Sequence, residues 1–271
     1  RRQRQMCIRD RLKRIVIKVG SSVLTETTTI AKERMLNLAS LIAEARKKYE
    51  VILVTSGAVA AGYTAVKLNR SVPTSKKVLA SVGQPILMSS YKNKFDIYDV
   101  PISQILLTEE DFDSRVHTKI FQDIINRTLR NDILPIVNEN DISTTPDQLF
   151  GDNDQLSAHI TYYTNAELLV ILSDIDGYYD ANPKDDPNAK IRKIVTEIKA
   201  EELEQEVTPN SQFATGGIVT KLKAADYIMS KHREMFLCNG YDLTSAREFL
   251  IEGVHNKGTL FTTQKDKKKE K

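Results

Sequence analysis

Short apolar runs alternate with longer amphipathic segments along most of this chain. The run RIVIKV (14–19) is followed by apolar residues at helical spacing over 30–48, and then by a second apolar run at 51–54. A short apolar run predicts a buried strand, whereas apolar residues every three or four positions predict an amphipathic helix. This β-α-β order is typical of a parallel sheet with helices on its faces.

The alternation continues to the end of the chain. Further strands are predicted at 102–108, 133–137, 167–172, 235–237 and 258–261, and helices at 76–91, 114–130, 154–163, 201–206, 215–231 and 245–251. Helix 76–91 contains Pro85 and is expected to bend there, because proline removes a backbone donor. The polar segment 184–210 is interpreted as surface structure and a candidate mobile lid. The chain is therefore expected to be an α/β protein.

Composition narrows the class of protein. With 271 residues and 41% hydrophobic content, the chain can bury a full core as one large domain or two modest ones. Its basic residues concentrate at the two ends, which we expect to be disordered tails at 1–12 and 262–271; the first eleven residues look foreign to the fold. Since the body between them is acidic overall, we expect no nucleic acid partner.

Cysteine content and hydropathy bear on location. Two cysteines cannot build a disulfide framework, and no Cys/His pair has the spacing of zinc ligands. No apolar run reaches the length of a membrane span, so no membrane partner is expected. These features favour a cytoplasmic protein.

The densest polar chemistry lies in 138–157, which reads NENDISTTPDQLFGDNDQLS. Because this stretch follows the apolar run 133–137, its acids and amides are expected at a strand's carboxyl end, where open α/β sheets bind ligands. They can hold a polar amino-acid substrate, or place Mg²⁺ and cationic side chains around phosphates. The alternative is an acidic solvated loop.

Lys18 interrupts the strand 14–19 just before Gly20-Ser21-Ser22. Burying an unpaired ammonium group costs several kcal/mol, so Lys18 is expected to reach an anion beyond the strand end. The small residues after it let a phosphate approach the backbone. A lysine that snorkels from an edge strand is the alternative.

Polar turns follow other predicted strands. The turn TSGA (55–58) offers backbone N–H groups and a hydroxyl to a carboxylate or phosphate. The alternative is a tight turn that serves packing alone. TGGIVTK (215–221) opens a helix with two glycines, a threonine and a lysine, which suits phosphate; a plain glycine-rich helix entry is the alternative. Ser173-Asp174 places an acid and a hydroxyl after the strand 167–172.

These clusters all follow strands, so their side chains can converge along one sheet edge. The converging residues are Lys18, Ser56, Asp141, Asn153, Asp174 and Lys221. Two lysines beside a carboxylate suit phosphoryl transfer, in which catalysis is mostly alignment and charge neutralisation. The chain contains no GxxxxGK[ST], HRD, DFG, GxGxxG or GxSxG motif. If the protein is a kinase, it therefore belongs to a fold other than those that these motifs mark.

Eight segments together resemble the glutamate kinases of the amino acid kinase family. In order they are RIVIKVGSS, VILVTSGAVAAG, ASVGQP, QILLT, LPIVNENDIS, FGDNDQLSA, LLVILSDIDGYYDANP and TGGIVTKLKAA. The resemblance implies one domain over 13–261, an open three-layer αβα sandwich with a mainly parallel sheet, whose N-terminal part binds glutamate and whose C-terminal part binds ATP. It implies phosphorylation of the γ-carboxylate of L-glutamate to L-glutamyl 5-phosphate, the first step of proline biosynthesis.

The resemblance also implies roles for individual residues. Lys18 would touch the γ-phosphate, Lys221 would support the transition state from the nucleotide side, and Asp154 would orient both. The glutamate-binding positions are Ser56, Gly57, Asp141 and Asn153. The ATP-binding positions are Lys18, Ser173, Asp174, Thr215, Gly216, Gly217, Ile218, Val219, Thr220 and Lys221. Mg²⁺ would bridge the ATP phosphates with few protein ligands, and no residue is assigned as a metal ligand.

Other implied properties concern regulation and assembly. Proline is expected to inhibit through the glutamate pocket, and a homo-oligomer, dimer or tetramer, is expected. Ala214 stands where the family usually has glycine, a change that costs about 1 kcal/mol if the position needs φ > 0. The PUA domain of many members is not expected after Phe261.

Two alternatives remain. One is a kinase of the same fold that acts on acetylglutamate, carbamate or UMP. The other is a catalytically silent sensor of glutamate or proline, but retention of both lysines and Asp154 argues against it, since a binder needs no charge at a transition state.

Overall fold

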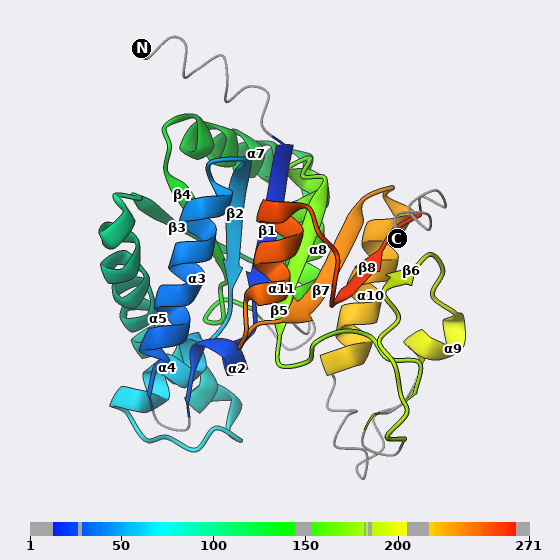
Figure 1. Cartoon of the computed structure of the whole chain (residues 1–271). Helices are drawn as coiled ribbons and strands as arrows, with labels where there is room; N and C mark the ends of the chain where they lie inside the picture. The colour runs from blue at the N-terminus through cyan, green and yellow to red at the C-terminus, as the bar shows by residue number, and fades with distance from the viewer. Residues whose placement is uncertain are drawn as a thin grey trace.

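A sheet of eight strands divides the described part of the molecule into two helical layers (Figure 1). The computed structural model describes residues 13–26, 29–144, 153–181, 183, 186–204 and 217–263. The strands are β1 Lys13–Val19, β2 Tyr49–Thr55, β3 Ile102–Leu107, β4 Leu134–Glu139, β5 Leu168–Ser173, β6 Ile194–Val195, β7 Glu234–Asn239 and β8 Thr259–Phe261. Their order is β3-β4-β2-β1-β5-β7-β8-β6, and the pairs from β3 to β7 are parallel.

Helices cover both faces of this sheet. They are α2 Ser21–Leu24, α3 Lys32–Ala45, α4 Ala58–Ala65, α5 Pro73–Phe95, α6 Glu110–Asp113, α7 Arg115–Arg130, α8 Asn153–Tyr163, α9 Ala200–Leu203, α10 Gly217–Ser230 and α11 Thr244–Arg247, with the short helices η1 Asp96–Tyr98 and η3 Glu248–Glu252. Residues of α3, α5, α11 and η3 join one core cluster, and residues of α7, α8 and α10 join the other.

The side chains of β1 show how the two layers are built. Ile15, Ile17 and Val19 lie in the cluster with α3 and α5, whereas Val16 lies in the cluster with α8 and α10. Because successive strand residues point to opposite faces, Lys18 shares the face of Val16. The lysine therefore points toward α8 and α10.

The predicted fold class is confirmed: the described residues form an αβα sandwich around a mainly parallel sheet. The sequence pattern missed the short elements α2, α6 and β6, and it did not indicate that β8 runs antiparallel to β7. Pro85 lies inside α5, which continues through it as one helix. No helix in the described ranges has the length and apolar character needed to cross a membrane.

Some expectations lie outside the described residues. The tail expected at 1–12 and most of that at 262–271 do so, as do Ala214 and residues 184, 185 and 205–210 of the candidate lid. The described part of that polar segment supplies β6, which pairs with β8 at the sheet edge, and α9.

Helices α4 and α5 approach so closely that two glycines are needed between them. A Cβ on Gly62 would lie 1.9 Å from the carbonyl oxygen of Leu79, and one on Gly83 would lie 1.8 Å from that of Ala58. Since α4 begins directly after Ser56-Gly57, this contact fixes the position of that turn against α5.

We expect Gly83→Ala to destabilise the protein by about 1–3 kcal/mol or more, because the added methyl group would overlap the backbone of α4. The free energy of unfolding in urea, followed by circular dichroism, measures the loss. Ser89→Ala, at an exposed position of the same helix, is the control and should leave stability almost unchanged. Equal stability of the two variants would contradict the close contact.

Candidate active site

The candidate site lies at the carboxyl ends of the central parallel strands. Lys18 is near the end of β1, Ser56 follows β2, Asn138 lies at the end of β4 and Ser173 ends β5. Parallel strands bring their carboxyl ends to one sheet edge, so residues far apart in the chain meet there.

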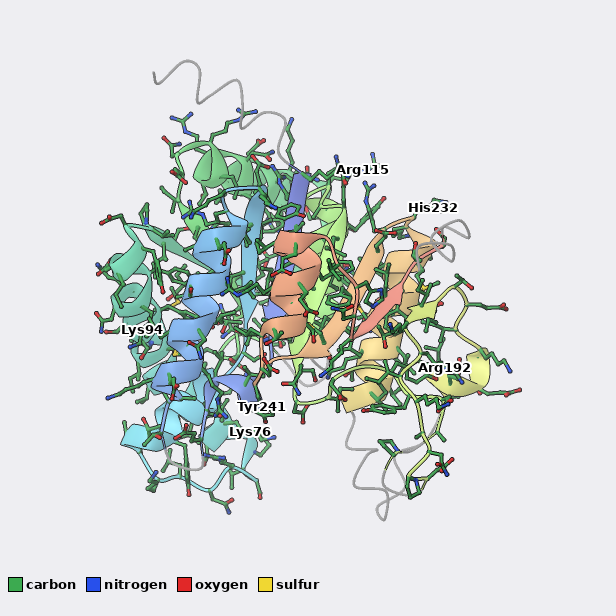
Figure 2. All side chains as sticks on the ribbon, in the orientation of Figure 1. Lys76, Lys94, Arg115, Arg192, His232 and Tyr241 are labelled. Carbon is green, nitrogen blue, oxygen red and sulfur yellow. The ribbon has the colours of Figure 1, made fainter. Side chains whose placement is uncertain are left out.

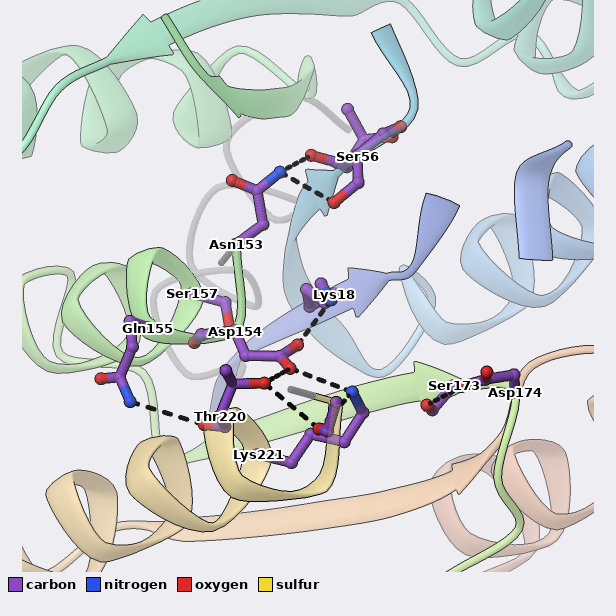
Figure 3. Close-up of polar contacts among 12 residues, drawn as sticks. Lys18, Ser56, Asn153, Asp154, Gln155, Ser157, Ser173, Asp174, Thr220 and Lys221 are labelled. Atoms are coloured by element: carbon purple, nitrogen blue, oxygen red, sulfur yellow. Dashed lines mark hydrogen bonds and ion pairs between the residues drawn. The ribbon is translucent and has the colours of Figure 1, made fainter. Parts of the chain in front are cut away.

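Asp154, in the first turn of α8, binds a lysine with each of its carboxylate oxygens (Figure 3). Lys18 Nζ lies 2.5 Å from Oδ1, and Lys221 Nζ lies 3.1 Å from Oδ2. The side chains of Asp154, Lys18 and Lys221 are 0%, 4% and 7% exposed. Three charges are thus buried together, two of them positive and one negative, so the trio is suited to an added anion.

The first turn of α10 supplies one side of this trio. Lys221 Nζ also donates to the carbonyl oxygen of Gly217 at 2.8 Å, which folds the lysine back over the start of the helix. Thr220 Oγ1 donates to Asp154 Oδ2 at 3.2 Å. The helix N-terminus and the ammonium group together present positive charge to one place.

The two ammonium groups control the protonation of Asp154. Burial alone would raise the pKa of this carboxyl, but the charges and hydrogen bonds of Lys18 and Lys221 outweigh burial and lower the pKa to about 2. Asp154 is therefore ionised at neutral pH and holds both lysine side chains in place.

A second polar cluster joins Asn153 to the turn after β2. Asn153 Nδ2 donates to the carbonyl oxygen of Thr55 and to Ser56 Oγ, both at 2.8 Å, and to Asn138 Oδ1 at 2.9 Å. Gly57 has φ 103°, a left-handed conformation that favours glycine, and it lets α4 begin at once. Ser56, Gly57 and Asn153, predicted from separate segments, are adjacent in the structure.

The remaining predicted positions are only partly brought to these clusters. Asp141 follows β4 and is half-buried, and burial raises its pKa, but within the described ranges it makes no hydrogen bond to Ser56 or Asn153. Ser173 Oγ donates to Asp174 Oδ1 at 2.9 Å at the end of β5 (Figure 3). Ile218 and Val219 lie in the first turn of α10. Thr215 and Gly216 lie outside the described residues.

Two residues of the site had no individual role in the sequence prediction, although Asn138 opens the predicted polar stretch 138–157. Asn138 accepts from Asn153, and Asn138 Nδ2 donates to Gln84 Oε1 at 2.9 Å. The change from apolar to polar at the end of β4 could have indicated Asn138. Gln84 carried no such signal, because it lies in a helix far from the predicted strand ends.

Comparison with known proteins defines the class. The model of the amino acid kinase family matches residues 13–239, and the chain belongs to this family. Curated relatives include a glutamate 5-kinase of Wolinella succinogenes, 51% identical over 255 residues that make up 92% of this chain and 98% of that protein. A glutamate 5-kinase of Leishmania donovani is 48% identical over 250 residues, covering 92% of this chain and 95% of that protein.

Solved structures share the fold at much lower identity. UMP kinase from Ureaplasma parvum superposes with a TM-score of 0.64 at 17% identity, covering 93% of this chain and 99% of that one. Carbamate kinase from Giardia lamblia bound to AMP-PNP has a TM-score of 0.64 at 17% identity, covering 94% and 99%. These likenesses bear on the fold alone.

The lowered pKa of Asp154 predicts a pH dependence of stability. Its folded-state pKa of about 2 lies below the unfolded value of about 3.9, so the stabilisation is present above the unfolded pKa and is lost as pH falls toward 2. Asp154→Asn should therefore show a shallower fall in unfolding free energy from about pH 5 to pH 2. At pH 7 it should be less stable by about 3–5 kcal/mol, because two buried lysines lose their counter-charge.

Urea unfolding at a series of pH values measures both effects. Asp226→Asn, which removes an exposed carboxylate from α10, is the matched control and should follow the unmodified protein. If the unfolding free energy of Asp154→Asn falls as steeply with decreasing pH as that of the unmodified protein, the ion pairs of Asp154 are not the cause of the acid destabilisation.

Proposed function

We propose that the protein is a glutamate 5-kinase, which transfers the γ-phosphoryl group of ATP to the γ-carboxylate of L-glutamate and releases ADP and L-glutamyl 5-phosphate. The observation that carries this proposal is the buried carboxylate of Asp154 between Lys18 and Lys221. It is supported by relatives named glutamate 5-kinase that match 92% of the chain at 48–51% identity. The reaction is the first step of proline biosynthesis.

The lysine pair explains how such a transfer is accelerated. As a carboxylate oxygen of glutamate bonds to the γ-phosphorus and the bond to the ADP oxygen breaks, negative charge spreads over the moving group. Lys18 approaches from the sheet and Lys221 from α10, and Asp154 keeps both in position before the reaction begins. No general base is required, because a glutamate carboxyl with a pKa of about 4.3 is already ionised at neutral pH.

The two polar clusters divide the substrates between them. Ser56, Gly57 and Asn153 lie on the side of β2 and α4, where we place glutamate. Asp141 follows β4, the strand that pairs with β2. Ser173, Asp174 and the first turn of α10 lie on the side where we place the ATP phosphates. This assigns glutamate to the N-terminal part and ATP to the C-terminal part of a single domain over 13–261.

A magnesium ion is proposed to enter with the nucleotide. In the part of the chain that the structure describes, no group of three His, Cys, Asp or Glu residues could hold a metal ion, and Asp154 is engaged by two lysines. The described residues therefore do not fit a protein-held ion. Bound to ATP, Mg²⁺ would neutralise phosphate charge.

Further properties rest on the resemblance to glutamate kinases. We propose that proline inhibits the enzyme by competing for the glutamate pocket, and that the protein forms a dimer or tetramer. The cytoplasmic location remains a prediction from cysteine content. Rates measured against glutamate concentration, with and without proline, test the first property: excess glutamate should restore the rate, and a proline-insensitive enzyme would remove this part only.

The decisive experiment is a coupled assay of ADP release from the full chain with Mg-ATP. Glutamate should support turnover, whereas acetylglutamate, carbamate and UMP should not. Preference for one of those three would replace glutamate with another substrate of the same fold. Binding of glutamate by calorimetry without ATP turnover would instead identify a sensor.

We expect Lys221→Ala to lower kcat by several powers of ten, because one of the two charges that stabilise the transition state is lost. Lys223→Ala removes an exposed lysine two residues along the same helix and should keep the parent kcat. The same ADP assay measures both variants. Unchanged activity in Lys221→Ala would defeat the assignment of this lysine.

A further inference from the structure

Three amides, two of them buried, form a relay that ends at the proposed glutamate site. Gln84 Oε1 accepts from Asn138 Nδ2 at 2.9 Å, and Asn138 Oδ1 accepts from Asn153 Nδ2 at 2.9 Å. Asn138 is 2% exposed and Asn153 is 9% exposed. Gln84 comes from α5, directly after Gly83, whose contact with Ala58 fixes α5 against the Ser56-Gly57 turn.

Two backbone groups fix which way each amide points. The carbonyl oxygen of Thr55 can only accept, so the atom of Asn153 that faces it must be the nitrogen. The backbone N–H of Glu139 can only donate, so the atom of Asn138 that it meets at 2.9 Å must be the oxygen. Asn138 then has only Nδ2 left to offer, so Gln84 must present Oε1 to it.

This fixed polarity leaves one acceptor at the site end of the relay. Asn153 Oδ1 is buried and has no hydrogen-bond partner among the described residues, and Figure 3 shows it on the opposite side of the amide from Ser56. At neutral pH a glutamate ligand carries two carboxylates, which only accept, and one α-ammonium group, which only donates. Of these groups, only the α-ammonium complements Asn153 Oδ1.

We propose that Gln84 is a positioning residue for the amino-acid substrate: by holding Asn138, it orients Asn153 so that Oδ1 accepts a hydrogen bond from the substrate's α-ammonium group. This inference rests on the proposed glutamate kinase activity. It makes the relay a device for selecting α-amino acids over dicarboxylates that lack the amino group.

Glutarate is glutamate without its α-amino group, so the ratio of kcat/KM for the two compounds isolates this contact. We expect the unmodified protein to favour glutamate by about a hundredfold or more, because glutarate leaves the buried acceptor unpaired. Gln84→Met removes the oxygen that Asn138 needs while preserving chain length. The ratio should fall by about tenfold or more, mainly through KM for glutamate, with KM for ATP and kcat changed by less than about threefold.

Gln84→Glu is the matched control, because a carboxyl oxygen still accepts from Asn138 Nδ2 while the Nε2 donor is lost. Its added charge raises KM for both dicarboxylates, but the glutamate to glutarate ratio should stay within about threefold of the parent. If melting curves show that Gln84→Met is unfolded, Gln84→Ala takes its place with the same ratio as readout.

The outcomes separate this inference from the proposed function. Absence of ADP release from the unmodified protein with glutamate would overturn the function itself. If the unmodified protein is active, an unchanged ratio in Gln84→Met would overturn the positioning role. Equal losses of kcat/KM with glutamate and glutarate would also overturn it, as would a ratio that falls in Gln84→Glu as much as in Gln84→Met.

Discussion

Two buried ammonium groups sharing one carboxylate are the constraint on which the rest of this structure depends. Asp154 can be ionised in the interior only because Lys18 and Lys221 contact it, and the lysines are tolerated there only because Asp154 is ionised. The three residues come from β1, α8 and α10, so the fold must bring these elements together for any of the charges to be stable. The geometry of the candidate site and the stability of the fold therefore require the same arrangement of β1, α8 and α10.

The sheet provides part of this arrangement through the alternation of side chains along β1. Apolar residues on either side of Lys18 point away from it into the core with α3 and α5, and the lysine points toward α8 and α10. The close contact of α4 and α5 at their two glycines holds the Ser56-Gly57 turn, at the start of α4, against the helix that carries Gln84. The trio of Lys18, Asp154 and Lys221 and the amide relay therefore meet at the start of α8, where Asn153 and Asp154 are consecutive residues.

Sequence reasoning predicted the fold class and the positions of the longer elements because buried strands and amphipathic helices have distinct periodicities. Because each lies near a strand end or a helix start, it grouped Lys18, Ser56, Asp141, Asn153, Asp174 and Lys221. The role of Asp154 came instead from the resemblance to glutamate kinases. Short elements such as α2 and β6 were missed, since a few residues carry no period. Gln84 could not be found because its importance comes from one hydrogen bond across 54 residues of chain.

The net positive charge of the trio of Lys18, Asp154 and Lys221 has a consequence for how the site is assembled. The charges of Lys18 and Asp154 balance each other, whereas Lys221 brings a surplus positive charge when the start of α10 packs onto the sheet. A bound polyanion removes that surplus. Binding of a polyanion, which we propose is ATP, and docking of the first turn of α10 are thereby thermodynamically linked, and each favours the other.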